Sequence, residues 1–243
     1  MRKTILATII IAASVLTGCI GETGRGFKLD NKDGQFSWMN GIIRFSVDLD
    51  SEQDKEDNPA FEAYVKCQDG KTIHMPIDVY NLGYGASCPM GMTGLYKPEK
   101  GFQYADILDK TKEKFVIHLH HKSWDILEAR ITLDKQITLY TGSPIMSVID
   151  YYTGPFELLN VAAGLSTARN GSVKKTDNGY VIEYPNGITG IIVMPNAEQL
   201  TVDVDGRSVF LKKSVTSDQP LRYYVGLSDK GESFLLEELA KIL

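Results

Sequence analysis

The chain has few cysteines and no surplus of positive charge. Its 243 residues include three cysteines, and 26 Lys and Arg are outnumbered by 31 Asp and Glu, which gives a formal net charge of −5. An acidic chain without Lys/Arg clusters lacks the basic surface with which proteins hold nucleic acid. It also has no CxxC or paired Cys/His pattern, so the ligand spacing of a structural zinc site is missing. We therefore expect no nucleic-acid partner and no metal site.

Cysteine is too scarce for a framework of disulfides. Apart from Cys19, the chain contains only Cys67 and Cys88. A disulfide between them is permitted in an oxidising compartment. Two cysteines in a chain of this size form either one disulfide or two buried thiols, and the sequence leaves both alternatives open.

Common catalytic and cofactor motifs are missing as well. No G-x-S-x-G elbow, Ser-His-Asp order or P-loop is present. The stretch IHMPIDVYNLGYGASCPMGM (73–92) has a G-x-G at Gly83 and Gly85, but Cys88 stands where a dinucleotide fingerprint needs the third glycine. No helix pattern follows to bind a pyrophosphate, so we expect no cofactor. Its glycines instead predict a connection between strands that approaches a neighbouring strand or a flat ligand closely.

Long apolar runs are confined to the N-terminus. Arg2 and Lys3 precede an uncharged apolar run over 5–16, and the segment ends in Leu-Thr-Gly-Cys at Cys19. This ending resembles the bacterial lipoprotein box, in which the cysteine is lipidated and becomes the new N-terminus. We expect residues 1–18 to be a signal peptide and Cys19 to hold the protein in the bacterial cell envelope, on the outer membrane. The alternative is an ordinary secretory signal.

The rest of the chain has the alternating pattern of β-strands. Residues 19–35 are polar and glycine-rich, as expected of a tether, and 36–243 are expected to form one domain. The tail from Ser233 predicts a short helix with Ser233 as its cap. Asn-Gly and Asp-Gly turns separate the runs, and an all-β sandwich or barrel is therefore expected. The strands are expected at 41–49, 60–67, 114–124, 126–133, 135–140, 144–152, 179–184, 188–195, 199–204, 208–215 and 221–227.

Several short blocks resemble a secreted, Bacteroidetes-associated family of unknown function whose genes accompany polysaccharide-degrading enzymes. The resemblance implies a galactose-mutarotase-like β-sandwich (a supersandwich) and a role in polysaccharide utilisation. Two departures bear on catalysis: Asn81 stands where the family usually has lysine, and AAGLSTA (162–168) lacks a histidine often found just after that block. The blocks are WMNGIIRFSV (38–47), IDVYNLGYGAS (77–87), EARITLDKQITLYTGSPIMSV (128–148), NVAAGLS (160–166) and LRYYVGLSDKG (221–231).

The candidate site residues follow from this resemblance and from residue chemistry. His74 lies four residues before Asp78, and such a pair can move protons on either side of a sugar ring. Otherwise His74 is a turn residue with satisfied hydrogen bonds. The guanidinium of Arg130 can bind a uronate carboxylate, and aromatic rings can stack on sugars. The alternatives are an ion pair between Arg130 and Glu128, and packing of the aromatic rings in the core. We assign to substrate binding Trp38, Tyr80, Tyr84 and Arg130.

The remaining histidines lie together. His118 and His120 alternate on one strand face, with His121 on the other. An H-x-H pair on a strand can chelate a metal, but no third ligand is evident nearby, and a solvated sheet face is the simpler interpretation.

Three functions remain open. We expect an envelope lipoprotein that binds or processes carbohydrate, with epimerase-like or lyase-like activity on oligosaccharides. The alternatives are a non-catalytic glycan-binding accessory protein and a purely structural envelope protein. An oligosaccharide or polysaccharide ligand, and a membrane reached through the N-terminal lipid, are the expected partners. The glycine stretch is expected at the rim of the sugar groove.

Overall fold

The computed structural model describes residues 28–32, 35–49, 61–75, 82–91, 94–96, 102–126, 129–202 and 206–243. Several residues discussed above lie outside these ranges, among them Cys19, Asp78, Tyr80, Asn81 and Glu128. The roles expected of them stay predictions.

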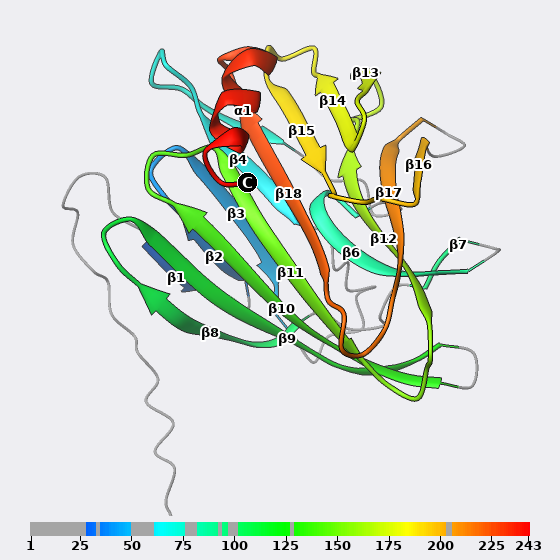
Figure 1. Ribbon diagram of the computed structural model, residues 1–243. Coiled ribbons are helices and arrows are strands. Elements are labelled where there is room, and N and C mark those ends of the chain that lie inside the picture. The colour runs from blue at the N-terminus through cyan, green and yellow to red at the C-terminus, as the bar shows by residue number, and fades with distance from the viewer. Residues whose placement is uncertain are drawn as a thin grey trace, which may run out of the picture.

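The centre of the molecule is an eight-stranded antiparallel sheet (Figure 1). Polar and apolar residues alternate along its long strands, so that one face is buried and the other is partly solvated. The strands follow one another in the order β13 (Ser172–Lys175), β14 (Gly179–Glu183), β15 (Thr189–Val193), β18 (Leu221–Ser228), β11 (Ile145–Thr153), β10 (Ala129–Tyr140), β9 (Lys114–Ile126) and β8 (Phe102–Lys110).

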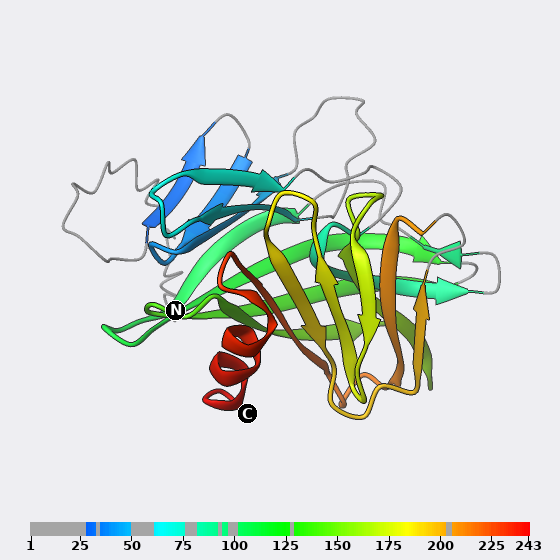
Figure 2. The same ribbon diagram turned by 90° about the horizontal axis from the view of Figure 1, so that it is seen from above.

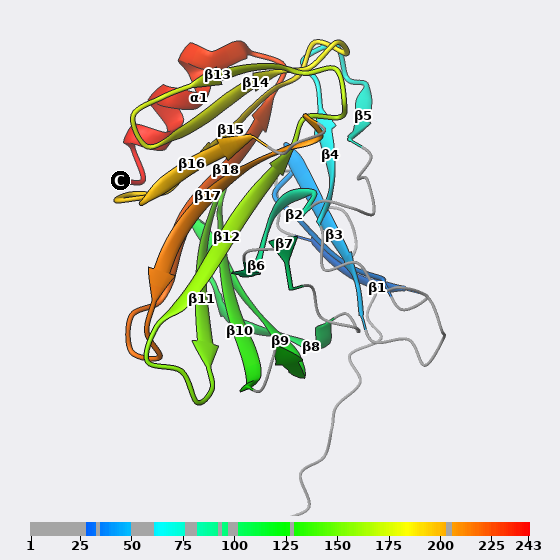
Figure 3. The ribbon, with the colours of Figure 1, turned by 90° about the vertical axis from the view of Figure 1, so that its right-hand side faces the viewer.

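Two five-stranded sheets pack against one side of this sheet, which we call its inner face (Figures 2 and 3). The opposite side is its outer face. The first small sheet consists of β1 (Lys28–Lys32), β2 (Gln35–Met39), β3 (Ile43–Asp48), β4 (Glu62–Lys66) and β5 (Thr72–Met75). The second has the order β16 (Gln199–Val202), β17 (Ser208–Val215), β12 (Leu159–Ser166), β6 (Tyr84–Gly91) and β7 (Gly94–Leu95).

The C-terminal helix, α1 (Gly231–Ala240), lies on the outer face (Figure 3). Leu235 and Leu239 are buried against apolar residues of β11, β14 and β15. The expected cap at Ser233 is wrong, because the helix begins after Lys230 and has no side-chain cap. No helix in the part of the chain that the structure describes is long and apolar enough to cross a membrane.

The main core lies between the inner face and the two smaller sheets. Trp38 has no exposed surface and contacts Phe45 and Phe61, with ring centroids 6.1 and 5.1 Å away. Asn40 fixes the turn between β2 and β3 on the central sheet, because its Nδ2 donates to the backbone oxygens of Tyr140 (2.8 Å) and Ser143 (2.7 Å). The asparagine of the WMNG block therefore has a structural role.

The expected all-β sandwich with one C-terminal helix is confirmed. The glycine stretch departs from expectation, because Tyr84–Gly91 forms strand β6 rather than a loop. The two strands expected at 126–133 and 135–140 are one long strand, β10. Strand β1 lies within the segment expected to be a tether, where pairing with β2 outweighs a polar sequence.

Candidate functional site

A group of polar side chains lies on the outer face where β8, β9 and β10 run side by side. On β9 the alternation buries Leu119 and leaves His118 and His120 half-buried, with side-chain exposures of 21% and 23%. Asp134 of β10 stands opposite His120, and Tyr104 of β8 stands opposite the same histidine on the other side. We call Tyr104, His118, His120 and Asp134 the outer histidine cluster.

One carboxylate oxygen of Asp134 lies within hydrogen-bonding distance of both imidazoles. Asp134 Oδ1 lies 2.8 Å from Nε2 of His118 and 2.7 Å from Nδ1 of His120. An ionised carboxylate only accepts hydrogen bonds, so each of these two nitrogens carries a proton. The hydrogen bond at one ring nitrogen fixes the state of the other. In the neutral imidazoles, Nδ1 of His118 and Nε2 of His120 are therefore acceptors.

Tyr104 provides an aromatic surface beside the histidines. Its ring stacks on His120 with centroids 4.9 Å apart and an interplanar angle of 17°, and it meets His118 edge-on at 5.9 Å. The tyrosine is 42% exposed. Partial burial raises the pKa of its hydroxyl, and the Asp134 and Asp106 carboxylates raise it further. The phenol is thus kept protonated, and its ring is open to a flat ligand.

The cluster can bind and orient a polar ligand and can exchange protons with it. An imidazole oriented by a carboxylate is the usual arrangement for a general base. Among the described residues, no group of three or more His, Cys, Asp or Glu side chains is placed to hold a metal ion. In this structure the H-x-H pair is engaged by Asp134 instead.

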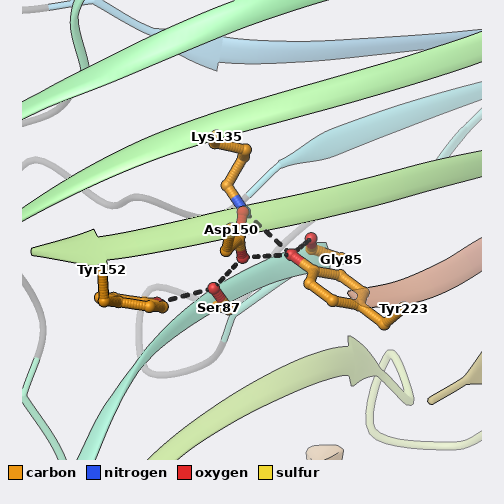
Figure 4. Close-up of polar contacts among 6 residues, drawn as sticks. All are labelled: Gly85, Ser87, Lys135, Asp150, Tyr152 and Tyr223. Carbon is orange, nitrogen blue, oxygen red and sulfur yellow. Dashed lines mark hydrogen bonds and ion pairs between the residues drawn. The ribbon is translucent and has the colours of Figure 1, made fainter. Parts of the chain in front are cut away.

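A second polar cluster lies inside the molecule, between β6 and the inner face (Figure 4). The ammonium group of Lys135 lies 2.6 and 2.7 Å from the two carboxylate oxygens of Asp150, and neither side chain has any exposed surface. The Tyr223 hydroxyl accepts a bond from Lys135 Nζ (2.8 Å) and donates to the backbone oxygen of Gly85 (2.7 Å). Three strands of the central sheet are thereby linked to β6.

The same carboxylate is bound by a hydroxyl of β6. The Ser87 hydroxyl donates to Asp150 Oδ2 and lies 2.7 Å from the Tyr152 hydroxyl (Figure 4). Burial raises the pKa of Tyr152 well above its usual range, and the Asp150 carboxylate adds to this; burial lowers the pKa of Lys135 while Asp150 opposes the shift. Because its side chains are closed to solvent, this buried network fixes β6 on the sheet and does not contact a ligand.

His74 lies on a different surface from the outer histidine cluster. It is exposed on β5, opposite Tyr64 of β4, and their rings stack with centroids 4.5 Å apart. Its Nε2 lies 3.8 Å from the Glu62 carboxylate, and the Arg44 guanidinium covers the Tyr64 ring at 3.7 Å. The partner expected for His74 lies outside the described residues, so that acid–base pair stays a prediction.

Of the other predicted site residues, those that the structure describes are not brought together. Arg130 is exposed on the outer face, 3.7 Å from Asp125, whereas His74 is exposed on β5, in one of the two sheets that cover the inner face. Trp38 and Tyr84 are fully buried and pack in the core, Tyr84 with its ring 6.2 Å from that of Tyr184. A ligand cannot reach those two side chains in this conformation.

Cys67 and Cys88 are not joined by a disulfide. Cys67 is half-buried at the end of β4, and Cys88 is buried in β6. The structure thus supports the alternative of two thiols. His121 is buried against Phe102, at 3.9 Å between ring centroids, which confirms that it faces away from His118 and His120.

Two members of the outer histidine cluster were not singled out by sequence reasoning. Asp134 gave a partial signal, because the pairing of Ala129 with Ile126 would place residue 134 opposite His121, and the register shift between Ile131 and Leu133 moves it opposite His120. Tyr104 gave a weaker signal, since its strand, FQYADILDK (102–110), has no clean alternation and two register shifts against β9.

No curated protein matches the chain. Among solved structures it is similar to heparan sulfate lyase HepC from Pedobacter heparinus, with 12% identity and a TM-score of 0.54 over 84% of this chain and 37% of that one. It is also similar to Heparinase III, with 12% identity and a TM-score of 0.52 over 84% of this chain and 36% of that one. The chain therefore spans little more than a third of the length of these enzymes, and at this identity the likeness shows the fold alone. The family model described as "Domain of unknown function (DUF4861)" matches residues 77–237, and the chain belongs to this family.

Proposed function

We propose that the protein binds carbohydrate on the outer face of its central sheet, at the outer histidine cluster. The observation that carries the proposal is the sharing of Asp134 Oδ1 by two imidazoles beside a 42% exposed tyrosine ring. The sandwich fold shared with heparan sulfate lyase HepC supports a carbohydrate ligand.

The chemistry of the cluster suits a sugar. The C–H face of a pyranose packs well on an aromatic ring such as that of Tyr104, and hydroxyl groups bond to carboxylates and imidazoles. Tyr151 lies opposite Asp134 on β11 and is 39% exposed, so it extends the surface by one strand. A surface of this width fits several sugar units better than one.

A second candidate function, proton transfer on the bound sugar, is favoured by one further observation. Asp134 orients both imidazoles so that one nitrogen of each is left without a partner among the described residues. Epimerase-like and lyase-like reactions both need a base placed in this way. Lyase activity would appear as ultraviolet absorbance from a new conjugated double bond, and epimerisation as a change in the proton spectrum of the sugar.

Binding is tested on the full chain in detergent with a panel of plant and algal oligosaccharides. We expect Tyr104→Ala and His120→Ala each to weaken binding about tenfold, the effect of losing a contact worth about 1.4 kcal/mol. Calorimetric titration measures the change. His74→Ala is the matched control, since it removes an exposed, ring-stacked histidine from a different sheet. Equal losses in all three variants, or in His74→Ala alone, would refute this location.

We also propose that Cys19 carries the lipid that anchors the protein in the envelope. The motif at 16–19 and the apolar run before it support this. Cys19→Ala should shift the protein from the membrane fraction to the soluble fraction, because no acyl chain can then be attached. Fractionation with metabolic labelling by a fatty acid measures the shift. Retention of the variant in the membrane, or absence of label in the original chain, would contradict the proposal.

A further inference from the structure

We infer that the outer histidine cluster selects glycans rich in hydroxyl groups and rejects those that carry carboxylate or sulfate groups. This inference rests on the proposed binding function and adds a ligand class to it. Of the two proton-transfer reactions it keeps epimerisation, because a lyase acts on a uronate and so needs the carboxylate that the site rejects. It depends on which hydrogen-bonding groups the cluster leaves available once its internal bonds are made.

The bonds inside the cluster use up the donors of its two neutral imidazoles and leave the Tyr104 hydroxyl as its remaining side-chain donor. The protons on His118 Nε2 and His120 Nδ1 both point to Asp134 Oδ1. The groups that remain are Nδ1 of His118, Nε2 of His120 and Oδ2 of Asp134, none of which has a partner in the described part of the chain. With neutral imidazoles all three are acceptors. A ligand that engages these three groups must therefore supply donors.

The charges around the cluster also disfavour acidic ligands. Asp106 of β8 stands opposite His118 and is exposed, and within the described residues it makes no ion pair. Two described cations near these strands are already paired, Lys114 with Asp109 at 3.1 Å and Arg130 with Asp125 at 3.7 Å. Two carboxylates, those of Asp106 and Asp134, thus border the site.

Arg222 of β18 is an exposed cation on the outer face. In the strand register, Gln136 stands opposite Ile149 and Ile149 opposite Arg222, so two strand spacings separate Arg222 from β10. This distance is roughly 10 Å, near the Debye length in physiological salt. Arg222 is too far away to bind an acidic group that sits on the histidines.

The consequence differs between hydroxyl and acidic ligands. A sugar hydroxyl donates to the free acceptors and meets no repulsion. A carboxylate or sulfate group only accepts, so it leaves those acceptors unpaired and lies beside two like charges. The site therefore discriminates against an acidic ligand in two ways: it presents acceptors to which the acidic group cannot bond, and its carboxylates repel that group.

The experiment compares uronan oligosaccharides with the same oligosaccharides after chemical reduction of their carboxyl groups. The two members of each pair share linkage and stereochemistry and differ in charge at C6. In calorimetric titrations of the full chain in detergent, the reduced member should bind at least about tenfold more tightly. Its affinity should be nearly independent of salt.

Asp106→Asn should raise the affinity for the acidic member about threefold or more and leave that for the reduced member within about twofold, because one repelling charge is removed. Asp177→Asn, at an exposed turn between β13 and β14, is the control and should change neither. Tighter binding of the acidic members would overturn this inference and leave the proposed function standing. Failure of every member to bind would overturn both.

Discussion

Replacement of Asp150 by valine is expected to lower the free energy of unfolding by about 3–5 kcal/mol. The change leaves the Lys135 ammonium group buried with no exposed surface and with the Tyr223 hydroxyl as its remaining bonding partner. An uncompensated charge in the core is far costlier than a lost surface ion pair. Urea denaturation, with slopes compared between variants, measures the loss.

The paired replacement Lys135→Met with Asp150→Val is the control for this result. Removing both charges eliminates their desolvation cost, and the hydroxyl of Tyr223 still bonds to the Gly85 oxygen. The double variant should therefore be more stable than Asp150→Val and within about 1–2 kcal/mol of the original chain. A double variant as unstable as the sum of the single changes would show that the ion pair itself is needed.

Gly85→Ala is expected to cost about 2–5 kcal/mol, the second large effect. Gly85 has φ +113°, and an added Cβ would lie 2.7 Å from Cγ2 of Val225, whose strand carries Tyr223. The backbone of β6 must approach β18 this closely for the Gly85 oxygen to reach the Tyr223 hydroxyl. A side chain here both strains the backbone and pushes the two sheets apart.

Gly187→Ala separates these two contributions. Gly187 has φ +84° in a turn, and nothing lies within 4 Å of the Cβ that the alanine would carry. It should cost only the backbone strain, about 1–2 kcal/mol. Thermal or urea unfolding of both variants gives the difference. If Gly187→Ala proves as costly as Gly85→Ala, the close approach of the sheets contributes nothing.

The sequence was sufficient for the fold class and for most long strands, because alternation in β9, β10 and β11 reflects one buried and one solvated face. It was insufficient for β6, where Gly85, Ala86, Ser87 and Cys88 show no alternation. Every residue from Tyr84 to Pro89 is buried, so the local pattern carries no face preference, and small residues are used because two sheets meet there.

The buried network also escaped notice, although it left a trace in the sequence. Lys135 lies on the same face of its strand as Leu133 and Ile137, and Asp150 lies on the same face as Val148 and Tyr152. Two opposite charges on the otherwise apolar faces of neighbouring strands indicate a buried ion pair. Such pairing depends on register, which the sequence alone does not supply.

For the outer site, sequence reasoning found His118 and His120 but attributed catalysis to His74. The glycine stretch after His74 directed attention to a different surface, and the acid–base pair expected there stays a prediction. The deciding residue is Asp134, which is distant from the histidines in sequence and adjacent to them only through the β9–β10 pairing. A carboxylate joined to two imidazoles is visible only once the hairpin is formed.

The most direct test of the proposed site is a nuclear magnetic resonance measurement of the imidazoles, which is practical because the chain has few histidines. With four histidines in the chain, a ¹⁵N-histidine spectrum of the imidazoles can be assigned by single substitutions. We expect His118 to be protonated at Nε2 and His120 at Nδ1, and both to shift on titration with a reduced, uncharged oligosaccharide while His74 does not. Shifts confined to His74, or the opposite tautomers at His118 and His120, would contradict the account.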